Sequence, residues 1–497
     1  MTGVSMTIVL SILMPLLGIF GNTFLRQHKN LRDSFTFLVS VLTFSSVFVV
    51  FLLTGGIQQE ELSILTVLPN LDIAFKVEPI GLLFALVASG LWMLTHLYGI
   101  GYMRGTNEDR QSQFFAFFCV AIFAVMGLCF AANMFTLFIF YEILTLSTYP
   151  LVAHKGDAKS VSGARVYLGM LLGTSIVFLL TALIWTYVLV GHLDFMPGGI
   201  LKDKIEVGLL PLLLGLYAFG IGKAALMPLH RWLPAAMVAP TPVSALLHAV
   251  AVVKAGVFTI LKVGVYIFGL DFLAESGASQ WLIWLAAISI ILASVFALMQ
   301  DNLKKRLAYS TVSQLSYITL AMALATPMAA VGGGMHIAMH AFGKIALFMC
   351  AGAIYVATKK TEISDMSGLG KSMPITFTIF AIASFSIIGL PPFGGSWSKF
   401  LLFMGAIETE YFVIILVLMI SSLLNVAYLL PIVGRGFFIS SGEGKEVKSI
   451  KEAPLLCWLP AAIAAIACIL LFFYAGLIQD FLLRIVDAVS YTHHRAH

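Results

Sequence analysis

The chain has 497 residues, of which 60% are hydrophobic and 11% are charged, and its formal net charge is +5 at pH 7. A soluble globular chain carries about 25% charged residues, so this composition excludes a set of soluble domains and indicates a polytopic membrane protein. The small positive charge comes from basic loops and does not indicate a nucleic-acid partner.

Apolar runs of about 20 residues recur along the chain, each long enough to cross a bilayer as a helix. We predict a single transmembrane domain, all-α, with about fourteen transmembrane helices. The predicted spans are 5–24, 32–54, 78–98, 112–130, 133–153, 164–190, 207–227, 241–268, 279–300, 307–325, 330–357, 374–408, 411–433 and 455–480. The run 374–408 is long for one span and contains GLPPFGG at 389–395, which predicts a discontinuous helix.

The basic residues of the loops alternate from side to side. Loops on the side reached after the first span carry 19 lysines and arginines, and those on the opposite side carry 5. The positive-inside rule therefore predicts a multi-pass protein of the cell membrane with both termini on the outer side. We interpret the first apolar run as a retained helix, because no basic segment precedes it. The five cysteines lie in apolar runs without CxxC spacing, so we expect no redox cofactor.

In chain order, Glu142 is the first ionisable residue deep within a span. A buried carboxylate is costly unless it is protonated, paired or hydrogen-bonded. One hypothesis is a proton site paired with a lysine, and the other is a structural hydrogen bond to Ser147 or Thr148. Lys223 lies one turn before Pro228, and we expect it to line an opened helix rather than to extend to the membrane surface.

His248 and Lys254 follow in the eighth span. Six residues of ideal α-helix separate them, a rise of about 9 Å and an angular offset of about 120°. They could therefore face one polar channel from adjacent directions. Lys262 lies two further turns along, close to the predicted end of the span. It could either take part in the same function or extend to the interface.

His336, His340 and Lys344 are spaced four residues apart in the eleventh span, so one stripe of a helix carries all three. This pattern favours stepwise proton transfer through water over buried structural histidines. A metal site is a weaker alternative, because no acidic residue or cysteine accompanies the pair. Lys399 follows the Gly/Pro break in GLPPFGGSWS, where freed carbonyls can bind water or a cation. We interpret it as a proton exit or gate.

Several motifs together resemble one family. They are YEILTLSTYPLVAHKG (141–156), KAALMPLHRWLPAAMVAPTPVSALLHAVAVVK (223–254), DNLKKRLAYSTVSQLSY (301–317), HAFGKIALFMCAGAIY (340–355) and GLPPFGGSWSKF (389–400). They resemble the antiporter-like subunits of Mrp-type multisubunit Na⁺/H⁺ antiporters, of respiratory complex I and of energy-converting hydrogenases. The motifs are most similar to those of the D-type Mrp subunit and its hydrogenase-linked relatives.

The resemblance implies two inverted five-helix repeats, at 112–268 and 279–433, between N-terminal helices in 1–111 and a last helix at 455–480. Helices 7 and 12 would be discontinuous, at 228–242 and 391–392. It implies that Glu142 pairs with Lys223, that Lys254 connects the halves, and that Lys344 and Lys399 continue the path. The chain departs from some relatives by carrying both His248 and Lys254, and by ending the path in Lys399 rather than a glutamate.

The sequence therefore predicts a proton-translocating subunit of a cation/proton antiporter, acting with other membrane subunits. The expected transported ion is H⁺, with Na⁺ or K⁺ as the candidate exchanged cation, and we expect no cofactor or metal of the chain's own. The alternative is a proton-pumping subunit of a complex I-type or hydrogenase-type redox complex, with the electrons in partner subunits. A membrane-embedded transferase is a third interpretation, which the short basic loops disfavour.

Overall fold

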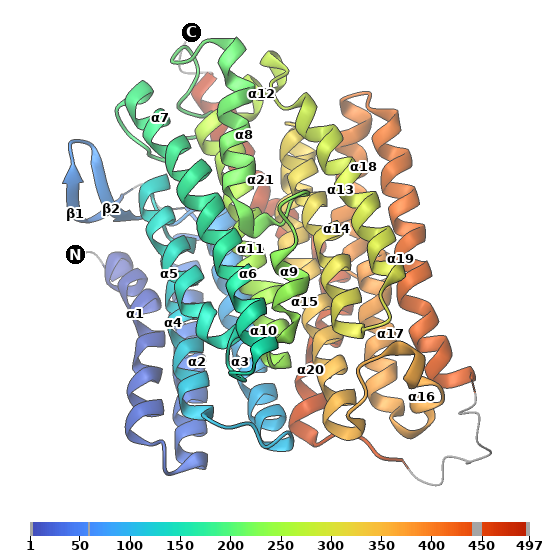
Figure 1. The fold of residues 1–497 in the computed structure, drawn as a ribbon. Coiled ribbons are helices and arrows are strands. Elements are labelled where there is room, and N and C mark those ends of the chain that lie inside the picture. Colours follow the sequence, from blue (N-terminus) through green and yellow to red (C-terminus); the bar gives the residue numbers. More distant parts are fainter. Residues whose placement is uncertain (1–2, 58–59, 440–449, 494–497) are drawn as a thin grey trace.

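The computed structural model describes residues 3–57, 60–439 and 450–493, with side chains as far as Arg484. It is a bundle of long helices from which one β-hairpin projects (Figure 1). The elements up to residue 268, with η marking 3₁₀ and π turns, are α1 (Gly3–Phe24), α2 (Lys29–Thr54), β1 (Leu62–Leu68), β2 (Leu71–Phe75), α3 (Pro79–Gly105), α4 (Gln111–Cys129), α5 (Met134–Val152), α6 (Ala158–Thr174), η1 (Ser175–Leu179), α7 (Leu180–Val190), η2 (Val207–Leu209), α8 (Leu210–Gly220), η3 (Gly222–Ala224), α9 (Trp232–Ala235), η4 (Ala236–Val238), α10 (Thr241–Leu246), η5 (Leu247–Ala251), α11 (Val252–Lys262) and η6 (Val263–Phe268).

The second part of the chain is also helical. Its elements are α12 (Leu270–Ser276), α13 (Gln280–Met299), α14 (Leu303–Ala323), α15 (Pro327–Thr358), η7 (Ile363–Met366), α16 (Leu369–Ser372), α17 (Pro374–Ile388), α18 (Gly395–Glu408), α19 (Phe412–Phe438), α20 (Leu455–Phe473) and α21 (Ala475–His493). In Figure 1 the first helices (blue) and α17 to α19 (orange) lie at opposite sides of the bundle, with α10, α11 and α15 between them.

Within the described residues, eleven helices are long and apolar enough to cross a membrane. They coincide with eleven of the fourteen expected spans, so the all-helical membrane fold is confirmed, whereas the count of fourteen stays a prediction. The other three expected spans are the short α8, the polar α14 and the divided pair α17 and α18. Helix α14 is less apolar because its buried face carries serine, threonine and glutamine side chains.

Two of the expected spans are interrupted. Helix α17 ends at Ile388 and α18 begins at Gly395, so the break predicted at GLPPFGG is confirmed. The other break begins earlier than the expected 228–242, because α8 already ends at Gly220 and α9 begins only at Trp232. Lys223 therefore lies inside the interrupted segment, in the single turn η3, and not at the end of a helix.

The structure adds a hairpin to one predicted connection and divides one predicted span. The polar connection before the third span contains the hairpin β1–β2, whose antiparallel pairing runs from Leu62 opposite Phe75 to Leu68 opposite Leu71. Asn70 turns the chain with a φ of 57°, a left-handed conformation that asparagine tolerates better than most residues. The last expected span also divides, because α20 ends at Phe473 and a separate helix, α21, follows.

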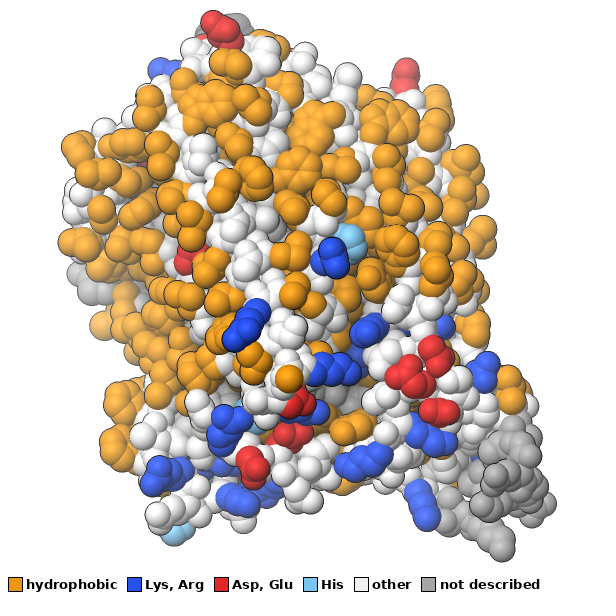
Figure 2. Space-filling model, in the orientation of Figure 1, with side chains coloured by type: hydrophobic (Ala, Val, Ile, Leu, Met, Phe, Trp, Pro, Cys, Tyr) orange, Lys and Arg blue, Asp and Glu red, His pale blue; other side chains and the backbone are white. Residues whose placement is uncertain are grey.

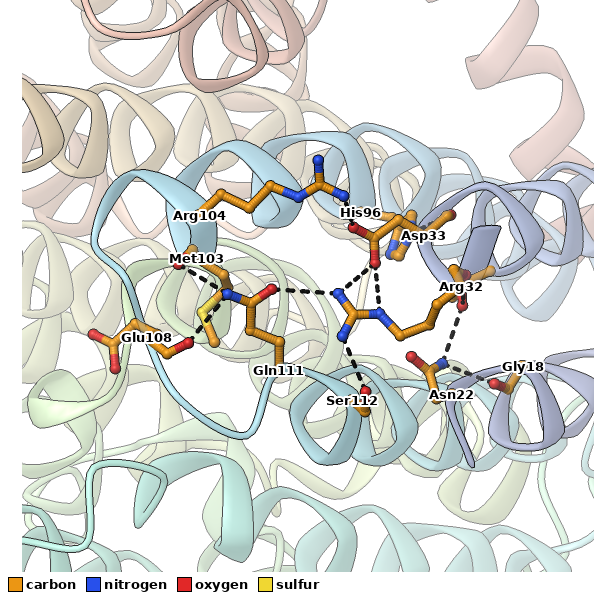
Figure 3. Close-up of polar contacts among 11 residues, drawn as sticks. Gly18, Asn22, Arg32, Asp33, His96, Met103, Arg104, Glu108, Gln111 and Ser112 are labelled. Atoms are coloured by element: carbon orange, nitrogen blue, oxygen red, sulfur yellow. Dashed lines mark hydrogen bonds and ion pairs between the residues drawn. The ribbon is translucent and has the colours of Figure 1, made fainter. Parts of the chain in front are cut away.

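A polar cluster joins the first four helices (Figure 3). Arg32, 2% exposed, donates to Asp33 at 2.7 Å, to Ser112 at 3.0 Å and to Gln111 at 3.3 Å. Arg104, near the end of α3, reaches the same Asp33 carboxylate at 2.5 Å. Arg32 is thus a buried cross-link, because Asp33 and the start of α4 satisfy its guanidinium.

The surface has the pattern of a membrane protein. Apolar side chains cover most of the face drawn in Figure 2, and charged side chains gather toward its lower end. In Figure 1 that end carries the connection between α1 and α2. Large apolar side chains stay exposed on the outer helices, for example Leu52 at 64%, Ile184 at 57% and Leu423 at 69%. Lipid covers such side chains at no hydrophobic cost, so the exposed belt supports a multi-pass membrane location.

Candidate functional site

A series of ionisable side chains is buried inside the bundle, although such groups are costly in a membrane. The seven predicted lysines and histidines are all at most 4% exposed: Lys223, His248, Lys254, His336, His340, Lys344 and Lys399. The interrupted helices carry the first and last of them, and α11, η5 and α15 carry the others. We call this series the buried axis.

The first part of the axis lies where η3 faces α5. The Lys223 ammonium donates to the Tyr141 carbonyl at 2.8 Å and to the Thr145 hydroxyl, and it lies 3.2 Å from the centre of the Tyr141 ring. The expected direct ion pair with Glu142 is absent among the described residues. The ammonium is held instead by Tyr141 and Thr145, on either side of Glu142 along α5, so the pairing with Glu142 stays a prediction.

Glu142 itself is buried at its carboxylate, and neither oxygen has a hydrogen-bond partner in the described part of the chain. The alternative of a structural bond to Ser147 or Thr148 is wrong. Ser147 donates to the Leu144 carbonyl at 3.1 Å, and Thr148 is occupied by Leu144 and Tyr167. An unpartnered buried carboxyl group is expensive, which is typical of a functional site rather than a structural one.

The break that carries Lys223 is held in place by two contacts. Trp232, on the far side of the break, donates its indole N–H at 2.9 Å to the Gly222 carbonyl, which also accepts from the Ala225 N–H at 3.0 Å. Gly256 of α11 packs directly under the turn, and a Cβ at this position would lie 2.3 Å from the Lys223 carbonyl carbon. Only glycine permits this approach, so α11 fixes the depth at which Lys223 enters the bundle.

His248 lies between the first and second parts of the axis. Its ring lies 6.1 Å from that of Tyr167 and 6.3 Å from that of Trp232, and neither ring nitrogen has a hydrogen-bond partner among the described residues. It belongs to the π-helical turn η5, Leu247–Ala251. The ideal α-helical offset of 120° between His248 and Lys254 therefore does not apply, because a π turn lies between them. Such turns are frequent at functional sites.

Lys254 connects the two halves. Its ammonium contacts Nδ1 of His340 on α15. The rings of His340 and His336 are 5.6 Å apart, as their spacing on one stripe predicts. His336 in turn contacts the Ser398 hydroxyl at 2.9 Å and the Gln314 carbonyl oxygen at 3.1 Å. Because both ring nitrogens of His336 have partners, a metal ion held by the two histidines would have to displace Ser398 or Gln314.

Lys344 leads into a second set of contacts, on α14 and α19. Its ammonium donates to the Ser310 hydroxyl at 2.5 Å and to the Leu307 carbonyl at 3.2 Å. Ser310 is 2.8 Å from the Tyr428 hydroxyl, which is 2.5 Å from the Asn425 amide. The chain of hydrogen bonds therefore extends from Lys344 to Asn425.

Asn425 joins this chain to the remaining residues. In the amide orientation that satisfies all its neighbours, the Asn425 oxygen accepts from Gln314 at 3.2 Å and from Lys399 at 3.0 Å. The Asn425 nitrogen then donates to the Ser421 carbonyl at 3.2 Å. Lys399 also donates to the freed Ile388 carbonyl at 2.9 Å, at the C-terminal end of α17, where the helix dipole favours a cation. Gln314 and Asn425, which were not predicted, thus link His336 to Lys399.

Lys262 does not extend to the interface, contrary to one of its two interpretations. It is 0% exposed, and its ammonium forms an ion pair with Glu78 at 2.6 Å. Glu78 was not predicted as a functional residue, because it is the first residue of a predicted span and follows a connection that contains Lys76 and Asp72. Within the described residues, no three His, Cys, Asp or Glu side chains are grouped in a way that could hold a metal ion.

Comparison with protein families gives two matches. The model described as "NADH:quinone oxidoreductase/Mrp antiporter, TM" matches residues 131–425, more than half of the chain. The model described as "NADH-Ubiquinone oxidoreductase (complex I), chain 5 N-terminus" matches residues 67–115. The first match contains every residue of the buried axis.

Two curated relatives are each 33% identical to the chain. NADH-quinone oxidoreductase subunit N of Desulforudis audaxviator (strain MP104C) aligns over 368 residues, 71% of each chain. The A/B subunit of a probable K(+)/H(+) antiporter of Rhizobium meliloti (strain 1021) aligns over 347 residues, 69% of this chain but 34% of its own length. The chain thus spans most of the first relative and about a third of the second.

Two solved structures share the fold over almost the whole chain. A chain of the Mrp complex from Dietzia sp. DQ12-45-1b superposes with a TM-score of 0.85 and 20% identity, covering 99% of both chains. A chain of the membrane-bound sulfane sulfur reductase, an archaeal respiratory membrane complex, superposes with a TM-score of 0.84 and 24% identity, covering 97% of both. At these identities the likeness concerns the fold.

Proposed function

Because the chain belongs to the NADH:quinone oxidoreductase/Mrp antiporter family of membrane subunits, we propose that it translocates protons along its buried axis. It would do so as the D-type subunit of an Mrp-type antiporter that exchanges H⁺ for Na⁺ or K⁺. One observation carries the proposal. Lys254, His340, His336, Gln314, Asn425 and Lys399 form a run of close contacts between buried side chains.

Protons would enter near Glu142 and Lys223, and pass His248 to Lys254. From there they would move through His340, His336 and Lys344, and leave near Lys399. Each of these side chains can hold and release a proton, and the hydroxyl and amide groups between them orient the transfers. Because the charges share a medium of low polarity, a proton that moves at one position changes the electrostatic energy at the next. Events at Glu142 can therefore drive events at Lys399.

The contacts at Lys223 fit a switch. Its ammonium bonds to Tyr141 and Thr145, which lie next to Glu142 and one turn along α5, while the Glu142 carboxylate has no partner among the described residues. A rotation of the lysine side chain could exchange these neutral partners for the carboxylate. A charge pair that forms and breaks would couple proton entry to the rest of the axis.

A second candidate is a proton-pumping subunit of a redox complex of the complex I or hydrogenase type. It is favoured by the 71% mutual coverage with an NADH-quinone oxidoreductase subunit and by the fold shared with an archaeal respiratory complex. In either case the chain would work with other membrane subunits. Identifying the subunits that copurify with it distinguishes the candidates, since iron–sulfur or nickel subunits would indicate the redox complex.

Glu142 provides the test. We expect Glu142→Ala to abolish cation/proton antiport in everted membrane vesicles while the complex still assembles. The matched control is Glu275→Ala, which removes an exposed carboxylate 3.6 Å from Lys202 and should leave antiport unchanged. Near-normal antiport in the Glu142→Ala vesicles would refute the assigned pathway.

A further inference from the structure

The ion pair of Lys262 and Glu78 is buried, yet the pathway above does not use it. Its two side chains are 0% and 7% exposed, and Nζ and Oε2 are 2.6 Å apart. The lysine also donates to the Ala131 carbonyl at 3.1 Å and lies 3.7 Å from the centre of the Phe195 ring. Replacing such a pair by apolar residues is often neutral or stabilising, so stability alone does not explain it.

The pair lies at the end of the helix that carries Lys254. Lys262 follows Lys254 by eight residues of continuous α-helix, a rise of about 12 Å along α11. Their ideal angular offset is about 80°, so both side chains leave the same half of the helix. The pair therefore continues the axis from its centre toward the end of the first repeat.

A segment of chain closes over the pair. The ring of Phe195 covers Lys262, and the Phe195 backbone N–H donates to the Ala132 carbonyl at 3.1 Å. Met196 and Ile200 donate to the carbonyls of Tyr266 and Ile267, at 3.4 and 2.9 Å, so the segment is fastened across η6. The ion pair thus has a lid, which separates it from the outside.

Two carboxyl groups near this segment reach the surface: Glu61 is exposed, and Asp194, next to Phe195 in the chain, has a side chain that is 43% exposed and lies 3.2 Å from His192. Burial raises the pKa of Glu61 and of Asp194, and each is raised further by a neighbouring acid. The charges of Glu61 and Glu78 are close enough to interact, and Lys76 interacts with Glu61 and Asp194. Acids with raised pKa values hold and release protons nearer to neutral pH than free carboxylates. Glu61 and Asp194 can therefore exchange protons with water.

We propose that Glu78 and Lys262 form a proton port of the first repeat, which connects Lys254 with the surface that carries the β1–β2 hairpin. The inference rests on the proposed proton axis and adds a branch to it. In one cycle the Lys262 ammonium gives a proton to the Glu78 carboxylate, which leaves a neutral amine and a neutral acid. Glu78 then releases that proton to the outer acids, and Lys262 takes a proton from the side of Lys254. One proton moves, and the ion pair is restored.

Three variants, studied in the assembled complex, test the port. Glu78→Gln with Lys262→Met removes both charges at nearly constant volume and leaves no unpaired ion. Lys262→Arg keeps the ion pair but cannot release a proton, because arginine stays protonated in proteins. The control, Lys202→Met with Glu275→Gln, removes an exposed lysine–glutamate pair. Antiport in everted vesicles is measured together with the amount of assembled complex.

We expect the double variant and Lys262→Arg to lower antiport at least tenfold at normal assembly, and the control to stay within twofold of wild type. Antiport within twofold of wild type in the double variant would show that the pair is structural, and would overturn the port whether or not Lys262→Arg assembles. Lys254→Met, measured in parallel, distinguishes a failure of the proton port from a failure of the whole proton axis. If it abolishes antiport while the double variant is active, only the port fails, and if both are active, the proton axis fails as well.

Discussion

Gly256 offers a way to move Lys223 without changing its chemistry. An alanine Cβ there would lie 2.2 Å from the Ala224 nitrogen and 2.3 Å from the Lys223 carbonyl carbon, whereas ordinary contact begins at 3.4 Å. The turn η3 and α11 must therefore separate by about 1 Å. Overpacking of this kind costs about 1–3 kcal/mol, and a misplacement of about 1 Å can lower a rate about 10²-fold.

We expect Gly256→Ala to reduce antiport ten- to hundredfold, because Lys223 would lose its placement against Tyr141 and Thr145. The assay is antiport in everted vesicles, normalised to assembled complex. Gly173→Ala is the matched control, since nothing lies within 4 Å of a Cβ at that position of α6. If Gly256→Ala assembled normally and transported within twofold of wild type, the depth of Lys223 would not matter, and the reasoning would be refuted.

Two further predictions concern the second half of the axis and the orientation of the chain. Asn425→Leu removes the amide that joins Gln314, Tyr428 and Lys399, so antiport should fall at least tenfold while the complex assembles; unchanged antiport would mean that protons bypass this residue. Cysteines introduced at Lys155 and Lys204, both exposed, should react with an impermeant maleimide from opposite sides of the membrane, Lys155→Cys from the cytoplasm. Labelling of both from one side would contradict the assigned topology.

The buried lysines were predictable because each carries a cost that the sequence makes visible. An ammonium within an apolar run must find partners, and this alone singled out Lys223, Lys254, Lys344 and Lys399. Their partners were not predictable. Lys223 donates to the Tyr141 carbonyl and the Thr145 hydroxyl of α5 and not to the Glu142 carboxylate between them. Which of these groups its ammonium reaches depends on where α8 ends.

The uncharged members of the network escaped prediction for a different reason. Gln314 and Asn425 cost little enough in a helix that their presence alone does not indicate function, and only the packing of α14, α15 and α19 shows that they meet. Glu78 was not recognised because of its position, since a carboxylate at the edge of a predicted span is ordinarily a surface group. The aromatic ring that covers its partner Lys262 belongs to Phe195, in a different segment of the chain.

The two halves of the axis differ in a way that bears on mechanism. In the second half, hydroxyl, amide and imidazole groups connect the lysines, so protons can be passed without large movements. In the first half, His248 and Glu142 have no hydrogen-bond partners among the described residues, and Lys223 is held by neutral groups. Buried polar groups without hydrogen-bond partners raise the free energy of an arrangement, so a conformational change that gives them partners is favourable. If protons follow the proposed axis, we therefore expect the first half to switch and the second half to conduct.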